Sequence, residues 1–101
     1  MAQYPLNIPV GANLSAAITT NTTTAIQTGK SAVMVGYVAT NAGSAWTIEF
    51  YNGDPAGTGV SLGPAVTVAA GFVPLLTLRA PNGLYVVTAG TTAGSLKVAY
   101  F

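Results

Sequence analysis

The 101-residue sequence contains no cysteine and no histidine, and only five of its residues are charged. Without cysteine, the chain has no disulfide, no zinc–thiolate site and no thiol nucleophile. Cysteine content therefore does not indicate whether the protein works in an oxidising or a reducing compartment. Without histidine, it lacks the general base that most nucleophilic hydrolases use. These absences remove the commonest catalytic and metal-binding chemistries.

Charged residues make up 5% of the chain, whereas they are about a quarter of an ordinary soluble protein. The five are Lys30, Arg79, Lys97, Glu49 and Asp54. A net charge of +1 gives no electrostatic footprint for nucleic acid, so nucleic-acid binding is not expected. A surface with so few charges suits permanent burial against a partner, because a free monomer would lack the usual repulsion against self-association.

Long apolar runs are also missing. No stretch approaches the roughly 20 residues of a membrane-spanning helix, and no basic N-terminal region precedes an apolar run as in a signal peptide. The sequence therefore predicts neither a membrane segment nor a signal peptide. Half of the residues are nevertheless hydrophobic, and β-branched residues abound, so we expect one folded domain rather than a disordered chain.

The clearest predicted strand comprises residues 46–51, and a turn follows at residues 52–54. Side chains alternate along a strand with a period of two, so Trp46, Ile48 and Phe50 share one face, and the other face carries Thr47, Glu49 and Tyr51. A face with three large apolar side chains requires an opposing apolar surface, which the rest of the chain must supply. We therefore expect Trp46 to be buried.

Residues 32–40 predict a second long strand, and both of its faces are apolar. By alternation, one face carries Val33, Val35 and Tyr37, and the other face carries Met34, Gly36 and Val38. Such a strand should be central and covered on both sides, in part by a neighbouring subunit. We expect it to form an antiparallel hairpin with residues 46–51 across the turn at residues 41–44.

The other segments predict short strands between turn signals. A hairpin is expected within residues 14–28, with strands at residues 16–20 and 24–28 and a turn near Asn21. The further expected strands are residues 59–62, 66–68, 72–79, 84–88 and 95–101, with a flexible loop at residues 89–94. In the strand at residues 72–79, alternation places Leu75 and Leu78 on opposite faces.

Strands that recur every 8–12 residues without a helical period predict an all-β fold. The expected architecture is an antiparallel β-sandwich, Greek-key or jelly-roll-like, in a single domain of residues 14–101. Residues 1–13 precede it as an extended arm, for which the alternative is a disordered tail. The arm is apolar enough to dock on a partner, and we assign it and the long strand to an interface of Tyr4, Leu6, Ile8, Val10 and Tyr37.

Two patterns could indicate catalysis, and neither supports it. Residues 59–63 read G-x-S-x-G, but a hydrolase nucleophile elbow needs a strand–turn–helix setting and a histidine base. Glu49 and Asp54 are the only carboxylates, too few for a calcium loop and unsupported as a glycosidase pair. We interpret them as a solvated strand residue and a turn residue, so no catalytic, cofactor-binding or metal-binding residue is predicted.

The aromatic residues leave an alternative open. Tyr37, Tyr51, Tyr85 and Trp46 occupy predicted strands, where core or sheet-face packing is the better explanation. The alternative is that they form an aromatic platform for a sugar.

Three stretches carry a family resemblance: VATNAGS at residues 38–44, TIEFYNG at residues 47–53 and NGLYVVTAG at residues 82–90, with a final LKVAY at residues 96–100. Together they resemble a group of small proteins of about this length encoded by tailed bacteriophages. In that group a strand ending N-x-G precedes a T-hydrophobic-x-hydrophobic-Y-[DN] strand, and an N-G-L-x-V-x-T-x-G strand follows. The resemblance covers residues 30–101. The sequence departs from the pattern at Glu49-Phe50 and in its apolar arm.

The resemblance implies a β-sandwich virion component, such as a capsid decoration (cement) protein, with no catalytic residues. With the composition, it predicts a non-enzymatic structural protein, made in the host cytoplasm and bound to the outer capsid surface. The expected partners are the major capsid protein and further copies of itself in a homotrimer, with a dimer as the second choice, and without cofactor, nucleic acid or membrane. The alternative is a carbohydrate- or receptor-binding module of a phage tail or fibre.

Overall fold

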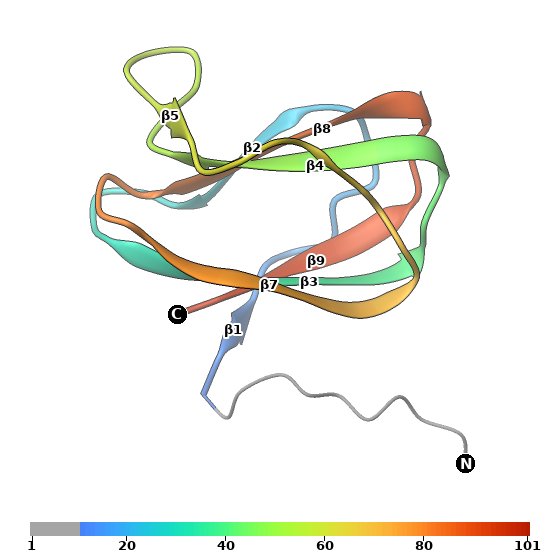
Figure 1. Ribbon diagram of the computed structural model, residues 1–101, viewed down its shortest axis with the longest axis horizontal. Helices are drawn as coiled ribbons and strands as arrows, with labels where there is room; N and C mark the ends of the chain where they lie inside the picture. The colour runs from blue at the N-terminus through green and yellow to red at the C-terminus, as the bar shows by residue number, and fades with distance from the viewer. Residues whose placement is uncertain (1–10) are drawn as a thin grey trace.

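A computed structural model describes residues 11–101, which form strands and contain no helix (Figure 1). The strands are β1 (Asn13–Leu14), β2 (Thr23–Gln27), β3 (Ala32–Asn41), β4 (Ser44–Asn52), β5 (Val60–Ser61), β6 (Val66–Thr67), β7 (Gly71–Ala80), β8 (Leu84–Thr92) and β9 (Ser95–Tyr100). The predicted arm, residues 1–13, overlaps β1 at Asn13, and its first ten residues lie outside the described part of the chain.

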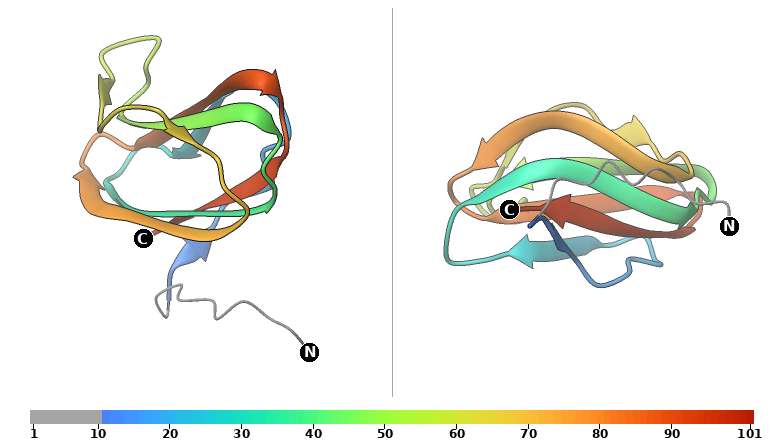
Figure 2. Two further views of the ribbon diagram at one scale, coloured as in Figure 1. Left: turned by 45° about the vertical axis from the view of Figure 1, so that its right-hand side comes forward. Right: turned by 90° about the horizontal axis from the view of Figure 1, so that it is seen from below.

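The strands form two sheets that face each other as two layers (Figure 2). Sheet A has the order β1-β9-β3-β7, and sheet B has the order β2-β8-β4-β5, with β6 also paired to β4. All pairings are antiparallel. The predicted antiparallel β-sandwich is confirmed.

The pairing is that of a jelly roll. The early strands pair in order with the late ones: β1 with β9, β2 with β8, β3 with β7, and β4 with β5. These pairs alternate between sheets A and B, as if one long hairpin were rolled up. Neighbouring long strands in the sequence therefore lie in opposite sheets, and the hairpins predicted within residues 14–28 and across residues 41–44 are wrong.

The turn between β3 and β4 carries the chain from sheet A to sheet B. Gly43 has a φ of 67° there, and a side chain at this position would collide with the backbone of Thr92, the last residue of β8, and of Gly94 in the turn between β8 and β9. The two crossovers thus pack directly against each other. The turn residues were recognisable in the sequence, but they do not specify which sheet the next strand joins.

A bulge in β3 changes which side chains face the core. The register against both β7 and β9 shifts between Met34 and Gly36. The inward and outward alternation of side chains is therefore offset after the shift relative to the residues before it. Met34 and Tyr37 consequently share the core face, although alternation had put them on opposite faces. The facing irregularity in β7 likewise brings both Leu75 and Leu78 against the core, which corrects the prediction that they lie on opposite faces.

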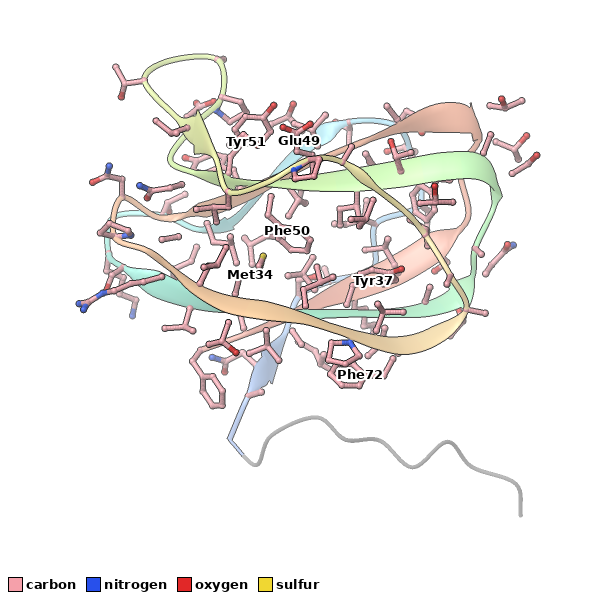
Figure 3. The ribbon with its side chains drawn as sticks, viewed as in Figure 1. Met34, Tyr37, Glu49, Phe50, Tyr51 and Phe72 are labelled. Atoms are coloured by element: carbon pink, nitrogen blue, oxygen red, sulfur yellow. The ribbon has the colours of Figure 1, made fainter. Side chains whose placement is uncertain are left out.

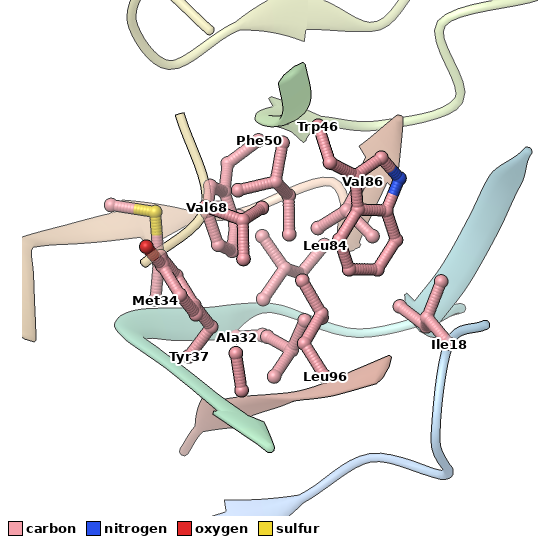
Figure 4. Close-up of a cluster of buried hydrophobic side chains, with 14 residues drawn as sticks. Ile18, Ala32, Met34, Tyr37, Trp46, Phe50, Val68, Leu84, Val86 and Leu96 are labelled. Carbon is pink, nitrogen blue, oxygen red and sulfur yellow. The ribbon is translucent and has the colours of Figure 1, made fainter. Parts of the chain in front are cut away.

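Both sheets contribute to one core (Figure 4). Trp46, Ile48 and Phe50 of β4 are all buried in it, as their alternation predicted. Trp46 is 0% exposed, and its Nε1 donates a hydrogen bond of 2.9 Å to the Asn21 Oδ1. This bond satisfies the one polar group of the indole inside an apolar interior.

The segment before β2 follows β9 and then crosses to sheet B. Ile18 exchanges backbone hydrogen bonds of 2.7 and 3.1 Å with Leu96. At the crossing, the buried Thr88 Oγ1 donates to the Thr20 carbonyl at 2.6 Å and accepts from the Thr22 N–H at 3.1 Å. β8 extends to Thr92, so the flexible loop predicted at residues 89–94 is wrong for most of its length.

Candidate functional site on the outer faces of the two sheets

The outer face of sheet A is mostly apolar. Three cross-strand pairs lie on it: Val33 with Phe101, Leu14 with Ala99, and Val38 with Phe72. Leu14 and Phe101 remain 46% and 44% exposed, and Phe72 points away from the core (Figure 3). Large apolar side chains that gather on one exposed face mark a surface for contact with another molecule.

Two further apolar residues of sheet A are buried outside the core. Val35 is 6% exposed and Ala99 is 0% exposed, yet neither belongs to the core cluster between the sheets. Sheet A therefore holds packed apolar side chains outside the core cluster as well as within it.

The charged residues within the strands are separated by sign, with cations in sheet A and a carboxylate in sheet B. Arg79, opposite Val33, and Lys97, opposite Val38, are the only charged residues in the strands of sheet A. Glu49 is the only one in the strands of sheet B, and Asp54 lies in the loop that follows β4. An apolar face with two cations and no anion favours an acidic partner surface.

The predicted interface residues fall in two places. Tyr37 is 1% exposed and lies inside the sandwich (Figures 3 and 4), where its hydroxyl accepts a 2.8 Å hydrogen bond from the Ala69 N–H. Its side chain thus fastens the segment after β6 and takes no part in the outer face. Tyr4, Leu6, Ile8 and Val10 lie outside the described residues.

The outer face of sheet B carries hydroxyls and phenols instead. From β4 and β8 it presents three opposed pairs: Thr47 with Ala89, Glu49 with Val87, and Tyr51 with Tyr85. Glu49 and Tyr51 lie on the side of β4 that faces away from Phe50 (Figure 3). This orientation was predicted from alternation, but the Tyr51–Tyr85 pair depends on a register that alternation does not give.

Glu49 is the centre of a polar cluster on that face. The Ser61 Oγ lies 2.6 Å from the Glu49 Oε2 and 2.6 Å from the Gly63 carbonyl, and its single proton donates to one of these two acceptors at a time. The pKa of the Tyr51 phenol is raised, first because Glu49 accepts a hydrogen bond from it, and then by burial and by the negative charge of Glu49. Glu49 therefore links β5 to the tyrosine pair.

The catalytic patterns stay unsupported in the fold. Ser61 of the G-x-S-x-G stretch lies on β5, with no helix following in the described chain. Asp54 closes its own loop, because its Oδ1 accepts from the Ala56 N–H at 2.9 Å and its carbonyl from the Gly59 N–H at 2.8 Å. Within residues 11–101, no three carboxylate, histidine or cysteine side chains gather to hold a metal ion.

The four aromatic residues of the possible sugar platform separate into two pairs. Trp46 and Tyr37 pack in the core, whereas Tyr51 and Tyr85 lie half-buried and directly opposed on the outer face of sheet B. Only the second pair is available to a ligand. Its polar neighbour Ser61, which the sequence did not identify as a binding residue, joins it because β5 pairs with β4 at Tyr51.

Two cavities open where the edges of the sheets separate. One, of about 190 Å³, is lined mainly by apolar side chains from β3, β4, β7 and the segment between β5 and β6, and includes Met34, Phe50, Leu75 and Leu78. The other, of about 330 Å³, lies between the segment at residues 14–18 and β2. Neither brings together the polar groups that a catalytic site requires.

Comparison with known proteins assigns no relatives: no protein-family model, no curated protein and no solved structure matches this chain. The described residues contain no helix of the length and apolarity needed to cross a membrane.

Proposed function

We propose that the protein is a non-enzymatic structural component of a phage virion, a capsid decoration protein that binds the outer capsid surface. The observation that carries the proposal is the apolar outer face of sheet A. A small domain with a complete core of its own has no folding need for a second apolar layer, so a partner surface accounts for it.

The predicted docking arm begins beside this face. A side chain at Gly11 would meet the Phe101 ring at 3.8 Å, so the chain before β1 starts at the edge of the apolar layer. Residues 4–10 contribute four more apolar side chains from that point. Each aliphatic side chain that becomes buried contributes about 1.5–3 kcal/mol before ordering costs.

Charge and fold support the same assignment. Arg79 and Lys97 give sheet A a positive outer face, which would complement an acidic capsid surface, whereas the negative charge of Glu49 would oppose docking of sheet B on such a surface. Jelly rolls recur in viral capsid proteins, but they also occur in lectins. The fold alone therefore does not distinguish a capsid protein from a carbohydrate-binding protein. The sequence resemblance to small phage proteins favours the virion.

A homotrimer is the proposed assembly. Closed symmetric oligomers are the usual way in which a soluble protein covers exposed apolar surface. Capsids present three-fold and quasi-three-fold positions, where a trimeric decoration protein would fit. Copies of sheet A and the arm at residues 1–13 would share the contact with one another and with the shell.

Cosedimentation tests the proposal with shells made of the major capsid protein encoded in the same phage genome. We expect the protein to bind these shells to saturation at micromolar concentration. Val38→Asp should abolish binding because it places a charge in the apolar face. Val87→Asp, the matched change on sheet B, should leave binding intact.

Deletion of residues 1–10 should weaken shell binding while the melting temperature of the sandwich stays the same. Absence of cosedimentation of the unsubstituted protein would refute the proposed function. Equal binding by the Val38→Asp and Val87→Asp variants would refute the assignment to sheet A.

A second candidate function has one observation in its favour. The Tyr51–Tyr85 pair on the outer face of sheet B is the kind of surface that a carbohydrate-binding module presents.

A further inference from the structure

The outer face of sheet B contains a row of side chains that crosses three strands. Tyr85 on β8, Tyr51 on β4 and Ser61 on β5 are consecutive partners in the ladder. Directly opposed side chains on one face have Cβ atoms about 4.5–5.5 Å apart. Two phenol side chains therefore lie next to each other, with a hydroxyl at one end of the row.

This row has the components of a sugar-binding platform. The axial C–H groups of a pyranose ring pack on the flat face of an aromatic ring, and tyrosine offers such a face at a small cost in conformational entropy. Two adjacent tyrosines give room for two successive sugar rings. Both side chains are half-buried, so their positions are set by the sheet before a ligand arrives.

Glu49 supplies the directional part of the site. It lies two residues before Tyr51 on the same face of β4, and its Oε2 is held 2.6 Å from the Ser61 Oγ. A carboxylate fixed beside an aromatic surface can accept hydrogen bonds from sugar hydroxyls without first losing rotamer freedom. Glutamate is disfavoured within strands, so its place at mid-strand in a chain with two carboxylates calls for a reason.

From this geometry we propose that the outer face of sheet B binds a neutral polysaccharide, with Tyr51 and Tyr85 as the stacking platform and Glu49 and Ser61 as polar anchors. Glu49 is the only charged residue in the strands of this sheet, and its negative charge disfavours acidic glycans. The site goes beyond the capsid role and does not rest on it. In a particle attached through sheet A, this platform would face outward.

Affinity electrophoresis tests the site with the intact protein. Native gels contain one of four neutral polysaccharides, namely dextran, laminarin, mannan or galactomannan, or the acidic polysaccharide alginate. We expect at least one neutral polysaccharide to retard the protein and alginate to have no effect. Tyr51→Ala and Tyr85→Ala should each weaken the retardation about tenfold, the usual scale for truncating a central aromatic contact.

Three further variants separate stacking from a general effect on the sheet. Tyr51→Phe keeps the ring and should keep most of the binding, whereas Glu49→Gln should weaken binding with only a small change in the melting temperature. Phe72→Ala removes an aromatic side chain from the opposite face and should bind the polysaccharide like the unsubstituted protein. Melting temperatures of all variants establish that they are folded.

Three outcomes would overturn the proposal: no retardation by any of the four neutral polysaccharides, retardation by alginate alone, or equal retardation of the unsubstituted protein and the two tyrosine-to-alanine variants. Capsid cosedimentation of the same variants is a separate readout, so failure of one proposal is distinguishable from failure of the other.

Discussion

Sheets A and B are alike on the inside and different on the outside. Towards the core, both present large apolar side chains, such as Tyr37 and Leu96 from sheet A and Trp46 and Val86 from sheet B. Away from the core, sheet A presents valine and phenylalanine with two cations, and sheet B presents threonine and tyrosine with one carboxylate. One shared core imposes the same requirement on both inner faces. The outer faces are free of that requirement, so their difference carries the information about function.

The largest effect is expected for an inner side chain of sheet B. Trp46→Ala should lower the free energy of unfolding by about 3–5 kcal/mol, because it leaves a large cavity and removes the hydrogen-bond partner of Asn21. Urea denaturation followed by far-UV circular dichroism measures the loss. The control Thr23→Ala, on the exposed outer side of β2, should change stability by less than about 0.5 kcal/mol. Native tryptophan emission at the wavelength of a water-exposed indole would contradict the burial.

A polar anchor on the same inner face should have the next largest effect. Thr88→Val keeps the shape of the buried side chain but removes its hydrogen bonds to Thr20 and Thr22, so we expect a loss of about 1–3 kcal/mol. Thr47→Val is the matched change on the outer face, where Oγ1 donates to the Ala89 carbonyl at 3.1 Å, and should cost less than about 0.5 kcal/mol. Equal midpoints for the two variants in urea would show that the hydroxyl of Thr88 does not anchor the crossing.

The inner faces were largely predictable where a strand is regular. The alternation of Trp46, Ile48 and Phe50 needs only local sequence, and so does the inward position of Leu96 and Val98. The sheet to which each strand belongs was not predictable, because pairing depends on partners far along the chain. A turn signal indicates that the chain reverses direction. It does not indicate whether the next strand pairs with the preceding strand or crosses to the opposite sheet.

The outer faces were less predictable, since a single bulge changes them. The extra residue near Val35 places Tyr37 in the core, although it was assigned to an interface. Glu49 and Tyr51 were correctly placed outward, but their neighbours Tyr85 and Ser61 are 34 and 10 positions away from Tyr51 and meet it only through the register. No local pattern records such a meeting.

The next largest effect is expected on self-association, which a substitution on the outer face of sheet A should weaken and one on the outer face of sheet B should not. We expect the protein to sediment as a trimer, and Phe72→Glu to weaken that association about tenfold or more by placing a charge in the apolar face of sheet A. Val87→Glu adds the same charge to sheet B and should leave the sedimentation coefficient unchanged. A stable monomer of the unsubstituted protein at micromolar concentration would count against the trimer.

The smallest expected effect concerns the polar cluster of sheet B and appears as a change in a pKa. The pKa of Tyr51 lies above its ordinary value of 10.0, chiefly because its phenol donates a hydrogen bond to Glu49. A raised pKa in the folded protein means that the contact stabilises the fold below pH 10.0 and that this contribution is lost as the pH rises through the raised value. Glu49→Gln removes the negative charge and should return the pKa towards 10.0.

Phenolate absorbance measures this shift, and a parallel titration of Tyr51→Phe assigns the signal to Tyr51. The difference between the two titrations should have its midpoint above pH 10.0 in the unsubstituted background and a lower midpoint in the Glu49→Gln background. Equal midpoints in the two backgrounds would show that Glu49 does not hold the phenol. The proposed sugar platform would then depend on the Ser61 hydroxyl, 2.6 Å from the Glu49 Oε2, to hold the carboxylate beside the two tyrosine rings.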